Sequence, residues 1–311
     1  MQLHNSLPGQ LHSSVSLQQL ELTVSGAFAR SERHARSQFF GVGEILNGVY
    51  EIRRLIGRGG MGQVFEALDY VLDRVVAIKV ANPGDRPGRL LREARALATL
   101  RGQGVPSVFS MGNWRGLEYC VMERVFGTTL ARHITHRLPR RLFSVSEVVE
   151  ILGGMAQALV RVHRAGMIHR DLKPENIMLV PQNRVVLIDF GLFRTEGHPW
   201  DEAGIWGSPR YIAPETITHK VRLGEEHLVD IYSLGVIAFF LLIGCPPFNS
   251  KSVSSILTKH VEQIAPRVSS MRADVPQELD LLVRDMLAKE PTDRPSSAEE
   301  VVVRLRSVAH S

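Results

Sequence analysis

Cysteine is scarce in this chain, which has two cysteines, Cys120 and Cys245, among 311 residues. They lie in apolar surroundings and form no Cys-x-x-Cys pair, so neither a disulfide framework nor a zinc site is indicated. We therefore expect a protein of a reducing compartment and assign it to the cytoplasm.

Long apolar runs are also missing. The run from Ile231 to Ile243 is too short to span a bilayer and is closed by Gly244, Pro246 and Pro247, so we interpret it as a buried helix. Residues 1–30 lack the basic segment followed by a continuous apolar segment that a secretory signal requires. We expect no membrane anchor.

Aromatic residues make up only 6% of the chain, and the formal net charge is +5 with a pI near 9.5. Such a basic balance is compatible with nucleic-acid binding. The basic residues are nevertheless dispersed except between Arg132 and Arg141, where no stacking aromatic accompanies them. We expect a solvated surface there and no nucleic-acid partner.

Residues 1–45 have no acid before Glu21 and are rich in Ser, Gln and His, with an Arg-Ser cluster from Arg30 to Ser37. This composition predicts a disordered N-terminal tail with at most a short helix near Leu17–Val24. An organelle transit peptide shares the Arg and Ser bias, but a flexible tail is favoured.

From Tyr50 onward, short apolar segments alternate with turn residues, which favours an antiparallel sheet. The predicted strands are Tyr50–Leu55, Val64–Leu68, Val75–Val80, Ser107–Met111 and Leu117–Glu123. Apolar residues of the segment 89–100 fall on one helical face. We expect a small lobe made of a five-stranded antiparallel sheet and one helix.

The second half of the chain is mainly helical by its periodicity. Ser144-Val145-Ser146-Glu147 offers a capping box, and apolar residues then recur at helical spacing until Gly166. Further helices are predicted at Leu228–Ile243, Val253–Gln263, Gln277–Ala288 and Ser297–Val308. The expected fold class is α+β, with a domain at 46–308 divided into a small lobe at 46–126 and a large, mainly helical lobe at 127–308.

Two motifs of the large lobe carry chemistry. The segment His169-Arg170-Asp171-Leu172-Lys173-Pro174-Glu175-Asn176 is followed by Asp189-Phe190-Gly191. Together they supply a carboxylate, a lysine, an amide and a second carboxylate, which suit nucleotide phosphates, metal ions and an incoming hydroxyl. The pattern indicates a phosphoryl-transfer site.

A glycine-rich segment, Gly57-Arg58-Gly59-Gly60-Met61-Gly62-Gln63-Val64, precedes them. In dinucleotide-binding folds such glycines lead from a strand into a helix, whereas here Gly62 leads into a second predicted strand. We therefore predict a hairpin whose bare backbone N–H groups can approach triphosphate oxygens. The alternative is a flexible surface turn, which the following lysine motif disfavours.

Lys79 lies in an apolar strand, where a charge is costly without a partner. We expect it to pair with the α- and β-phosphates and with a helix carboxylate, while Ala77 leaves room for a purine. Glu93 is the only acid in the predicted helix 89–100 and is the expected partner. Its alternative role is an intrahelical pair with Arg89 or Arg92.

With Val76-Ala77-Ile78-Lys79 and Ala213-Pro214-Glu215, these motifs occur in the order that protein kinases use. The chain resembles a bacterial, eukaryotic-like (Hanks-type) serine/threonine protein kinase over residues 46–308. The resemblance implies a two-lobed kinase fold that transfers the γ-phosphoryl group of ATP to serine or threonine hydroxyls of protein substrates. It also implies autophosphorylation and a signalling role.

The resemblance assigns roles to the residues of the cleft. Asp171 would orient the substrate hydroxyl and accept its proton, and Lys173 would neutralise the transferring group. Asn176 and Asp189 would bind Mg²⁺, or Mn²⁺ in its place. The expected ATP-binding residues are Ile56, Gly57, Gly59, Gly62, Val64, Ala77, Lys79, Met122, Glu123, Val125 and Met178.

Within that set, Met122 would lie behind the adenine, and the backbone of Glu123 and Val125 would meet the purine edge at the hinge between the lobes. Arg124 departs from the aromatic residue that related kinases often have there, so inhibitor preference at this hinge stays open.

The activation segment, from Leu192 to Ile212, contains Thr195 and Ser208 as hydroxyl residues for phosphorylation. The resemblance implies that Arg170 contacts this segment, and that Ser208 is a structural hydroxyl bonded to the catalytic Asp and Lys. At the position usually phosphorylated stands His198-Pro199-Trp200-Asp201-Glu202. We hypothesise that Asp201 or Glu202 partly substitutes for phosphate in pairing with Arg170.

Scaffold roles follow from the same resemblance. His169 is expected to pack against Phe190, and Asp230 to accept backbone N–H bonds from the catalytic loop. Glu215 is expected to pair with Arg294. Ordinary salt bridging or helix capping is the alternative for the acids.

Two other functions remain as alternatives. A pseudokinase scaffold would bind a nucleotide or a partner without transfer, but Lys79, Asp171, Asn176 and Asp189 are all present. A small-molecule kinase typically lacks the Ala-Pro-Glu segment, which is present here. Regulatory input is expected through the N-terminal tail, a partner protein or self-association of the small lobe.

Overall fold

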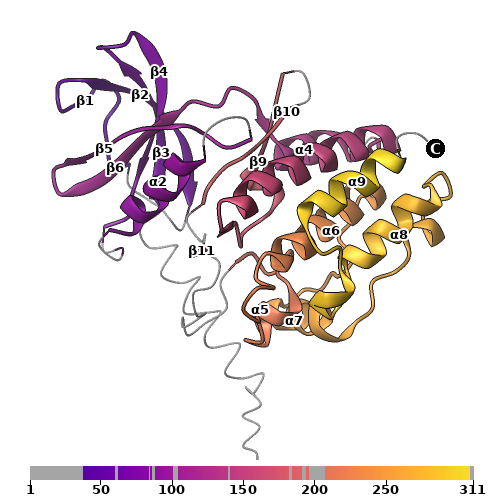
Figure 1. The fold of residues 1–311 in the computed structure, drawn as a ribbon. Coiled ribbons are helices and arrows are strands. Elements are labelled where there is room, and N and C mark those ends of the chain that lie inside the picture. Colours follow the sequence, from indigo (N-terminus) through magenta and orange to yellow (C-terminus); the bar gives the residue numbers. More distant parts are fainter. Residues whose placement is uncertain are drawn as a thin grey trace, which may run out of the picture.

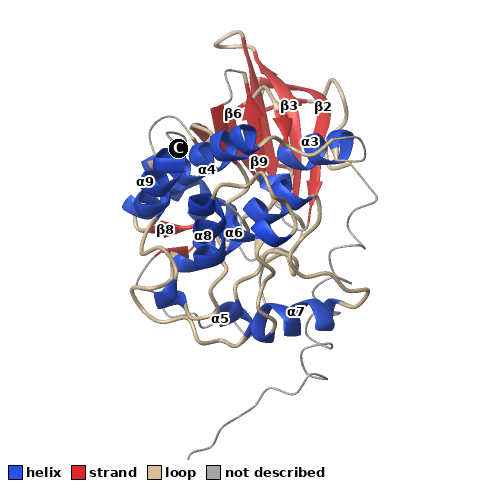
Figure 2. Ribbon diagram, turned by 90° about the vertical axis from the view of Figure 1, so that its right-hand side faces the viewer, coloured by secondary structure: helices blue, strands red, loops and turns tan. Residues whose placement is uncertain are grey.

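The computed structural model shows two lobes, one built on a sheet and the other mainly on helices (Figure 1). It describes residues 38–59, 62–83, 85, 88–100, 104–138, 141–181, 184–190 and 207–308, and the backbone of 194–195. The strands of the small lobe gather at one end of the molecule, away from most of the helices (Figure 2). The two-lobed α+β architecture expected from the sequence is confirmed.

Within the described residues, the sheet of the small lobe has six strands in the order β1-β2-β3-β4-β6-β5, and all neighbours are antiparallel. The strands are β1 (Ile45–Leu46), β2 (Tyr50–Gly59), β3 (Gly62–Asp69), β4 (Arg74–Val80), β5 (Val108–Trp114) and β6 (Leu117–Glu123). The five predicted strands are present. The expected count of five is wrong, because the short strand β1 was overlooked.

A tight turn at Asn47-Gly48 joins β1 to β2. Asn47 has a φ of 50° and Gly48 a φ of 71°, and the Val49 N–H donates to the Leu46 carbonyl at 3.0 Å. Two consecutive residues with positive φ are typical of the type I′ hairpin turn, for which Asn-Gly is the preferred pair. The Asn-Gly dipeptide was therefore a usable signal for β1.

Helix α2 (Arg89–Thr99) packs against β5 and β6. Its buried residues are Leu90, Glu93, Ala94 and Leu97, which recur at helical spacing. Glu93 consequently lies on the apolar face of the helix and points into the lobe instead of into solvent.

The apolar core of the small lobe begins before the first predicted strand. Phe40 is buried with Leu46 of β1 and with side chains of the central strands; the other core residues are Ile52, Phe65, Ala67, Val76, Ile78, Val80, Tyr119 and Val121. Of the disordered tail expected at 1–45, residues 1–37 lie outside the described residues. Residues 38–45 are described and pack on the small lobe, so the expected boundary is too late.

The large lobe contains helices of very different length. They are α3 (Leu130–Arg137), α4 (Val145–Arg164), α5 (Pro214–Ile217), α6 (Leu228–Ile243), α7 (Val253–Glu262), α8 (Gln277–Met286) and α9 (Ala298–Val308), with the 3-10 turns η1 (Pro174–Asn176), η2 (Val268–Ser270) and η3 (Pro291–Asp293). The long helices agree with the prediction, whereas α3 was missed because eight residues carry little periodic signal.

Short strands lie between the two lobes and were also missed. Strand β9 (Ile177–Val180) pairs with β10 (Arg184–Leu187) and with β7 (Thr128–Thr129), and β8 (Met167–Ile168) pairs with β11 (Arg194–Thr195). Because β9 and β10 form a hairpin, they bring the segments that flank them, which carry the two motifs of the large lobe, to the same end.

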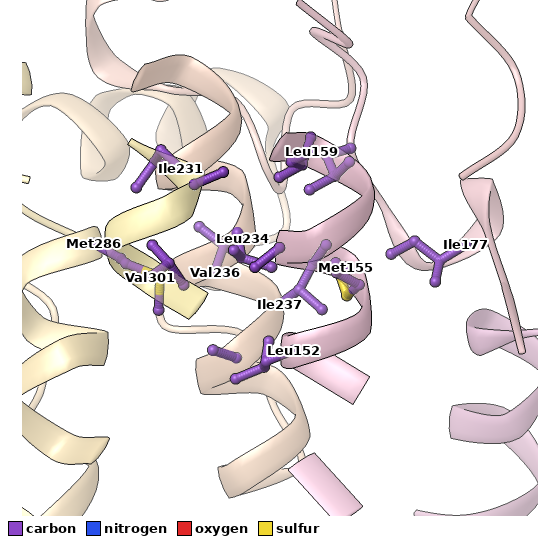
Figure 3. Close-up of a cluster of buried hydrophobic side chains, with 14 of the residues drawn as sticks. Leu152, Met155, Leu159, Ile177, Ile231, Leu234, Val236, Ile237, Met286 and Val301 are labelled. Carbon is purple, nitrogen blue, oxygen red and sulfur yellow. The ribbon is translucent and has the colours of Figure 1, made fainter. Parts of the chain in front are cut away.

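Helix α6 is buried on nearly all sides, as expected for a helix that is apolar around its whole circumference. It packs against α4 and α8, and α9 in turn packs against both of these helices (Figure 3). Figure 3 labels the buried side chains Leu152, Met155, Leu159, Ile177, Ile231, Leu234, Val236, Ile237, Met286 and Val301. Within the described residues, no helix combines the length and the apolar character needed to cross a bilayer.

The N-terminus of α4 carries the predicted capping box. The Ser144 hydroxyl accepts from the Glu147 N–H at 3.2 Å, and the Glu147 carboxylate accepts from the Ser144 N–H at 2.7 Å. The same carboxylate binds both Nη atoms of Arg137 at 2.8 Å. Arg137 is the main reason that the pKa of Glu147 falls to about 2.

Replacing Glu147 with Gln should lower the free energy of unfolding at pH 7 by about 1–2 kcal/mol, because glutamine retains the capping geometry but not the charge. A carboxyl whose folded pKa is depressed contributes stability above its unfolded pKa, here about 4.5, and loses it as the pH falls toward about 2. Urea denaturation at pH 7 and pH 3 should therefore show the difference from the parent protein shrinking at pH 3.

Glu278→Gln is the matched control, since Glu278 also lies in a first helical turn but makes no ion pair with a described residue. A difference for Glu147→Gln that stays constant between the two pH values would contradict the assignment.

Candidate active site

Lys79 on strand β4 is buried between two carboxylates from distant segments. Its Nζ donates to Glu93 Oε1 at 2.6 Å and to Asp189 Oδ1 at 2.7 Å. Burial alone would lower the pKa of Lys79, but Asp189 and Glu93 outweigh it, so the pKa is raised above its ordinary value. The ammonium group therefore stays charged where the two lobes meet.

A second cluster surrounds Asp171, which is itself buried. Lys173 Nζ donates to Asp171 Oδ2 at 2.6 Å, and Asn176 Nδ2 donates to the Asp171 carbonyl at 2.9 Å and to Oδ2 at 3.2 Å. Ser208 Oγ donates to Asp171 Oδ1 at 2.9 Å and accepts from Lys173 Nζ at 3.0 Å. The carboxylate is thus held by an ammonium, an amide and a hydroxyl, and the last of these shows that it accepts a hydrogen bond from a hydroxyl group.

The β9–β10 hairpin joins the two clusters. The Ile188 N–H donates to the Asn176 carbonyl at 2.9 Å, and Asp189 is the next residue. Burial would raise the pKa of Asp189, but the charge and hydrogen bond of Lys79, together with Lys173 and His169, outweigh it and keep that pKa below its ordinary value. All four groups that the sequence singled out, Lys79, Asp171, Asn176 and Asp189, therefore lie in one region between the lobes.

Asp230 of α6 binds the backbone of the loop that carries Asp171. Asp230 Oδ2 accepts from the His169 N–H and Oδ1 from the Arg170 N–H, both at 2.9 Å. Arg170 has a φ of 64°, a left-handed conformation that is unfavourable for a residue other than glycine. These two bonds hold the loop in that conformation.

His163 at the end of α4 is a further part of this support that the sequence analysis missed. Its Nε2 lies 2.9 Å from Asp230 Oδ2. Burial would raise the pKa of Asp230, but the interactions with His163 and His169 together outweigh it, and the pKa is lowered. The available signal was a histidine in the last turn of the helix, where Arg161 and Arg164 also lie. The ring of His169, in turn, packs 4.6 Å from that of Phe190.

Glu215 and Arg294 form a buried bidentate pair, with Nη–Oε distances of 2.7 and 2.8 Å. Arg294 also donates to the carbonyls of Leu228, Ala288 and Lys289. The segment Ala213–Glu215 is thereby fixed to the helical core.

The glycine-rich segment forms the expected hairpin between β2 and β3, where Gly57 is opposite Val64 and Gly59 is opposite Gly62. A Cβ on Gly62 would lie 1.9 Å from the Val80 carbonyl oxygen, so only glycine fits at this close approach. Ile56 and Val64 are half-buried, as expected for the lining of a cleft.

The remaining residues expected to meet a purine come from both lobes. Ala77 is buried and is opposite Met122 in the β4–β6 ladder. Met178 is buried at the start of β9. Glu123 is exposed at the end of β6, and its N–H donates to the Ser107 carbonyl.

The hinge differs from expectation in its side chains. Arg124 Nε donates to Glu66 Oε2 on β3 at 2.9 Å, and the Arg124 guanidinium also binds the Val125 carbonyl. One lone pair of that carbonyl is therefore occupied by the protein itself. The sequence did not indicate a role for Glu66, because nothing in the β3 pattern points to its distant partner Arg124.

Asn176 and Asp189 are suitable ligands for a hard divalent cation. Asn176 uses its amide nitrogen to bind Asp171, which leaves its carbonyl oxygen for a ligand, while the Asp189 side chain is 35% exposed. A few protein oxygens combined with phosphates and waters is the ligand set that Mg²⁺ prefers. The residues therefore fit the expected metal.

Part of the expected activation segment cannot be compared with the structure. Gly191, Asp201, Glu202 and the side chain of Thr195 lie outside the described residues. The proposed pairing of Arg170 with Asp201 or Glu202 stays a prediction.

Comparison with known proteins agrees with this geometry. The sequence model of the family described as "Protein kinase domain" matches residues 50–304. The serine/threonine-protein kinase PrkC of Bacillus subtilis is 31% identical over 86% of this chain and 41% of its own length. The serine/threonine-protein kinase PknL of Mycobacterium tuberculosis is 35% identical over 85% of this chain and 67% of its own length.

Among solved structures, the crystal structure of the Mycobacterium tuberculosis PknI kinase domain, determined as a cysteine-to-alanine mutant, aligns with a TM-score of 0.67 at 26% identity. The alignment covers 88% of this chain and 100% of the PknI chain. By contrast, this chain spans only about two fifths of the length of PrkC.

Replacing Arg294 with Ala should lower the free energy of unfolding by about 3–5 kcal/mol, because it leaves the buried Glu215 carboxylate without its partner. Arg164→Ala is the control, since its pair with Glu299 has side chains that are 71% and 38% exposed. Its effect should be less than about 1 kcal/mol. Urea denaturation measures both, and equal effects would show that the buried pair is not important for stability.

Proposed function

This chain belongs to the protein kinase domain family, and we propose that it is an ATP-dependent protein serine/threonine kinase, capable of autophosphorylation and acting in signalling. The observation that carries the proposal is the hydrogen-bonded cluster of Asp171, Lys173 and Ser208, together with the Lys79–Glu93 ion pair. We assign the kinase domain to residues 46–308, with the small lobe at 46–126 and the large lobe at 127–308.

The small lobe would bind and orient the nucleotide. Lys79, held by Glu93, offers a fixed positive charge to the α- and β-phosphates. The backbone of Gly57, Gly59 and Gly62 offers N–H groups to the phosphate oxygens. Ile56, Val64, Ala77, Met122 and Met178 would surround the purine, and the Glu123 and Val125 backbone would bind its edge.

The large lobe would supply the transfer chemistry. Asp171 orients the substrate hydroxyl and accepts its proton as the oxygen bonds to the γ-phosphorus and the bond to the leaving ADP oxygen breaks. Lys173 stabilises the negative charge on the transferring group. The contact of Ser208 with both residues supports this assignment, since it keeps them at hydrogen-bond distance.

Family membership implies the use of ATP and of a divalent metal, and we propose Mg²⁺, with Mn²⁺ as a substitute, bound by Asn176 and Asp189. When bound, the metal neutralises charge on the β- and γ-phosphate oxygens. Because Asp189 contacts Lys79, its carboxylate already lies where phosphate and ammonium must meet.

Two alternatives are weaker. A pseudokinase scaffold would not need a carboxylate, lysine and hydroxyl at bonding distance from one another. A small-molecule kinase would not need the segment around Glu215, which the buried pair with Arg294 fixes to the core. We therefore propose protein substrates, and the cytoplasm as the location because ATP is supplied there.

Replacing Asp171 with Asn should reduce the rate of phosphoryl transfer by about 10²–10⁴-fold, because the side chain no longer accepts the hydroxyl proton. Transfer from labelled ATP with Mg²⁺ to a generic basic protein, followed by phosphoamino-acid analysis, measures both the rate and the serine/threonine preference. Asp274→Asn, an exposed substitution with the same charge change, should retain the parent rate.

No transfer by the parent protein, with either Mg²⁺ or Mn²⁺, would favour the scaffold alternative. An Asp171→Asn variant as active as the parent would show that this carboxylate has no catalytic role.

We also propose self-association through the small lobe. The turn between β3 and β4 presents three consecutive apolar side chains, Tyr70, Val71 and Leu72, that are 49%, 72% and 61% exposed. Contiguous exposed apolar residues are typical of interaction surfaces. A second copy of this chain would cover them.

Replacing Leu72 with Glu should therefore shift a concentration-dependent dimer toward monomer in sedimentation or light-scattering measurements, by about tenfold in the dissociation constant. Val303→Glu is the control, since Val303 is 60% exposed on α9 of the other lobe. An unchanged dissociation constant for Leu72→Glu, or a parent protein that stays monomeric, would exclude this surface.

A further inference from the structure

The segment Gln38–Glu44, here called the N-terminal strap, precedes the region that matches the kinase family but packs on the small lobe. Phe40 is 1% exposed, and its ring centroid lies 5.5 Å from that of Phe65 on β3. A side chain buried this completely contributes to the core of the sheet. The strap is therefore part of the folded lobe.

The strap contacts the strand that leads out of the glycine-rich turn. The Phe39 N–H donates to Gln63 Oε1 at 3.0 Å, and Gln63, which is only 2% exposed, directly follows Gly62. Because a buried amide oxygen is costly to leave unpaired, this bond favours one position of both segments. Gln38 adds a bond from its Nε2 to the Phe40 carbonyl at 2.6 Å.

The strap lies on the face of the sheet opposite the nucleotide. Side chains alternate along a strand, so Gln63 and Phe65 point to the same face and Val64 to the other. Burial agrees, because Gln63, Phe65 and Ala67 are buried while Val64 and Glu66 are half-buried. The strap can therefore hold the backbone of β3 without occupying the cleft.

The other end of the strap is fixed independently. The Gly43 N–H donates to the Ile52 carbonyl at 2.8 Å, and the Ile52 N–H donates to the Glu44 carbonyl at 2.9 Å. Trp114 Nε1 donates to Glu44 Oε1 at 2.8 Å. The strap is thus anchored at Glu44 and reaches from there to Gln63.

We propose that Phe40 and Gln63 are positioning residues. They hold the β3 end of the glycine-rich segment and thereby control the affinity for the nucleotide. The inference rests on the proposed ATP binding. Gly62 gives the backbone little rigidity of its own, so the position of this strand end depends on what packs against β3. Neither residue contacts the groups that react, and the strap therefore determines nucleotide affinity more than the rate of transfer.

Gln63→Leu, which keeps the size of the side chain but leaves the Phe39 N–H unpaired, should raise the dissociation constant for ATP about fivefold by calorimetry. The KM for ATP should rise equally, while kcat at saturating ATP and the KM for the protein substrate should stay within about twofold. Phe40→Ala should act in the same direction, and Phe40→Leu should restore most of the affinity.

Tyr50→Phe is the matched control, because it removes the contact of the Tyr50 hydroxyl with Ser110, also in this sheet, at 3.1 Å. Its ATP affinity should equal that of the parent. If Gln63→Leu folds and binds ATP like the parent protein, the inference is wrong. If the parent itself binds no ATP, the proposed function fails instead.

A measurement on the parent protein needs no variant. Binding of ATP should slow hydrogen exchange of the Phe39 amide. ATP binding and the Phe39–Gln63 bond would both stabilise the β3 end of the glycine-rich segment, so each must favour the other. Exchange at Phe39 that is unchanged by ATP would overturn the inference.

Discussion

The burial of one positive charge constrains the relation of the two lobes. Lys79 on β4 satisfies its ammonium with Glu93 from α2 and Asp189 from the large lobe. A buried charge without a partner is strongly destabilising. For this region to be stable, α2, the sheet and the large lobe must therefore place these three side chains within contact distance. The position of α2 and of the segment that follows the β9–β10 hairpin is constrained by that requirement.

In the large lobe, the feature that needs stabilisation is an irregular loop. Asp230 belongs to α6, which is buried along nearly its whole length, and it binds two successive N–H groups of the loop that carries Asp171. The rigid helix therefore compensates for the unfavourable backbone conformation of Arg170. Asp171 can then be positioned accurately although it lies in a segment without regular structure.

Much of this arrangement could be predicted because it is encoded locally. The glycine hairpin, the strand with Lys79, the capping box at Ser144 and the apolar helix α6 each have a pattern within a few residues. Glu93 could be found because it is the only acid on its helix. Glu66 and Phe40 could not, because their partners are distant in sequence and no periodicity indicates them, and His163 gave only the weak signal of a histidine in the last turn of its helix. The eight-residue helix α3 was too short for a pattern to emerge, and the two-residue strand β1 has no periodicity, so that the Asn47-Gly48 turn after it was its one local signal.

The side chains at the hinge have a consequence for selective ligands. Arg124 is held against Glu66 with only 15% of each side chain exposed, and its guanidinium faces the ring of Phe126 at 5.1 Å. A compound that extends outward from the proposed purine position would encounter a planar cation with an aromatic neighbour, where many related kinases offer an aromatic side chain alone. An anionic or flat, electron-rich substituent would suit this exit, and a cationic one would be repelled.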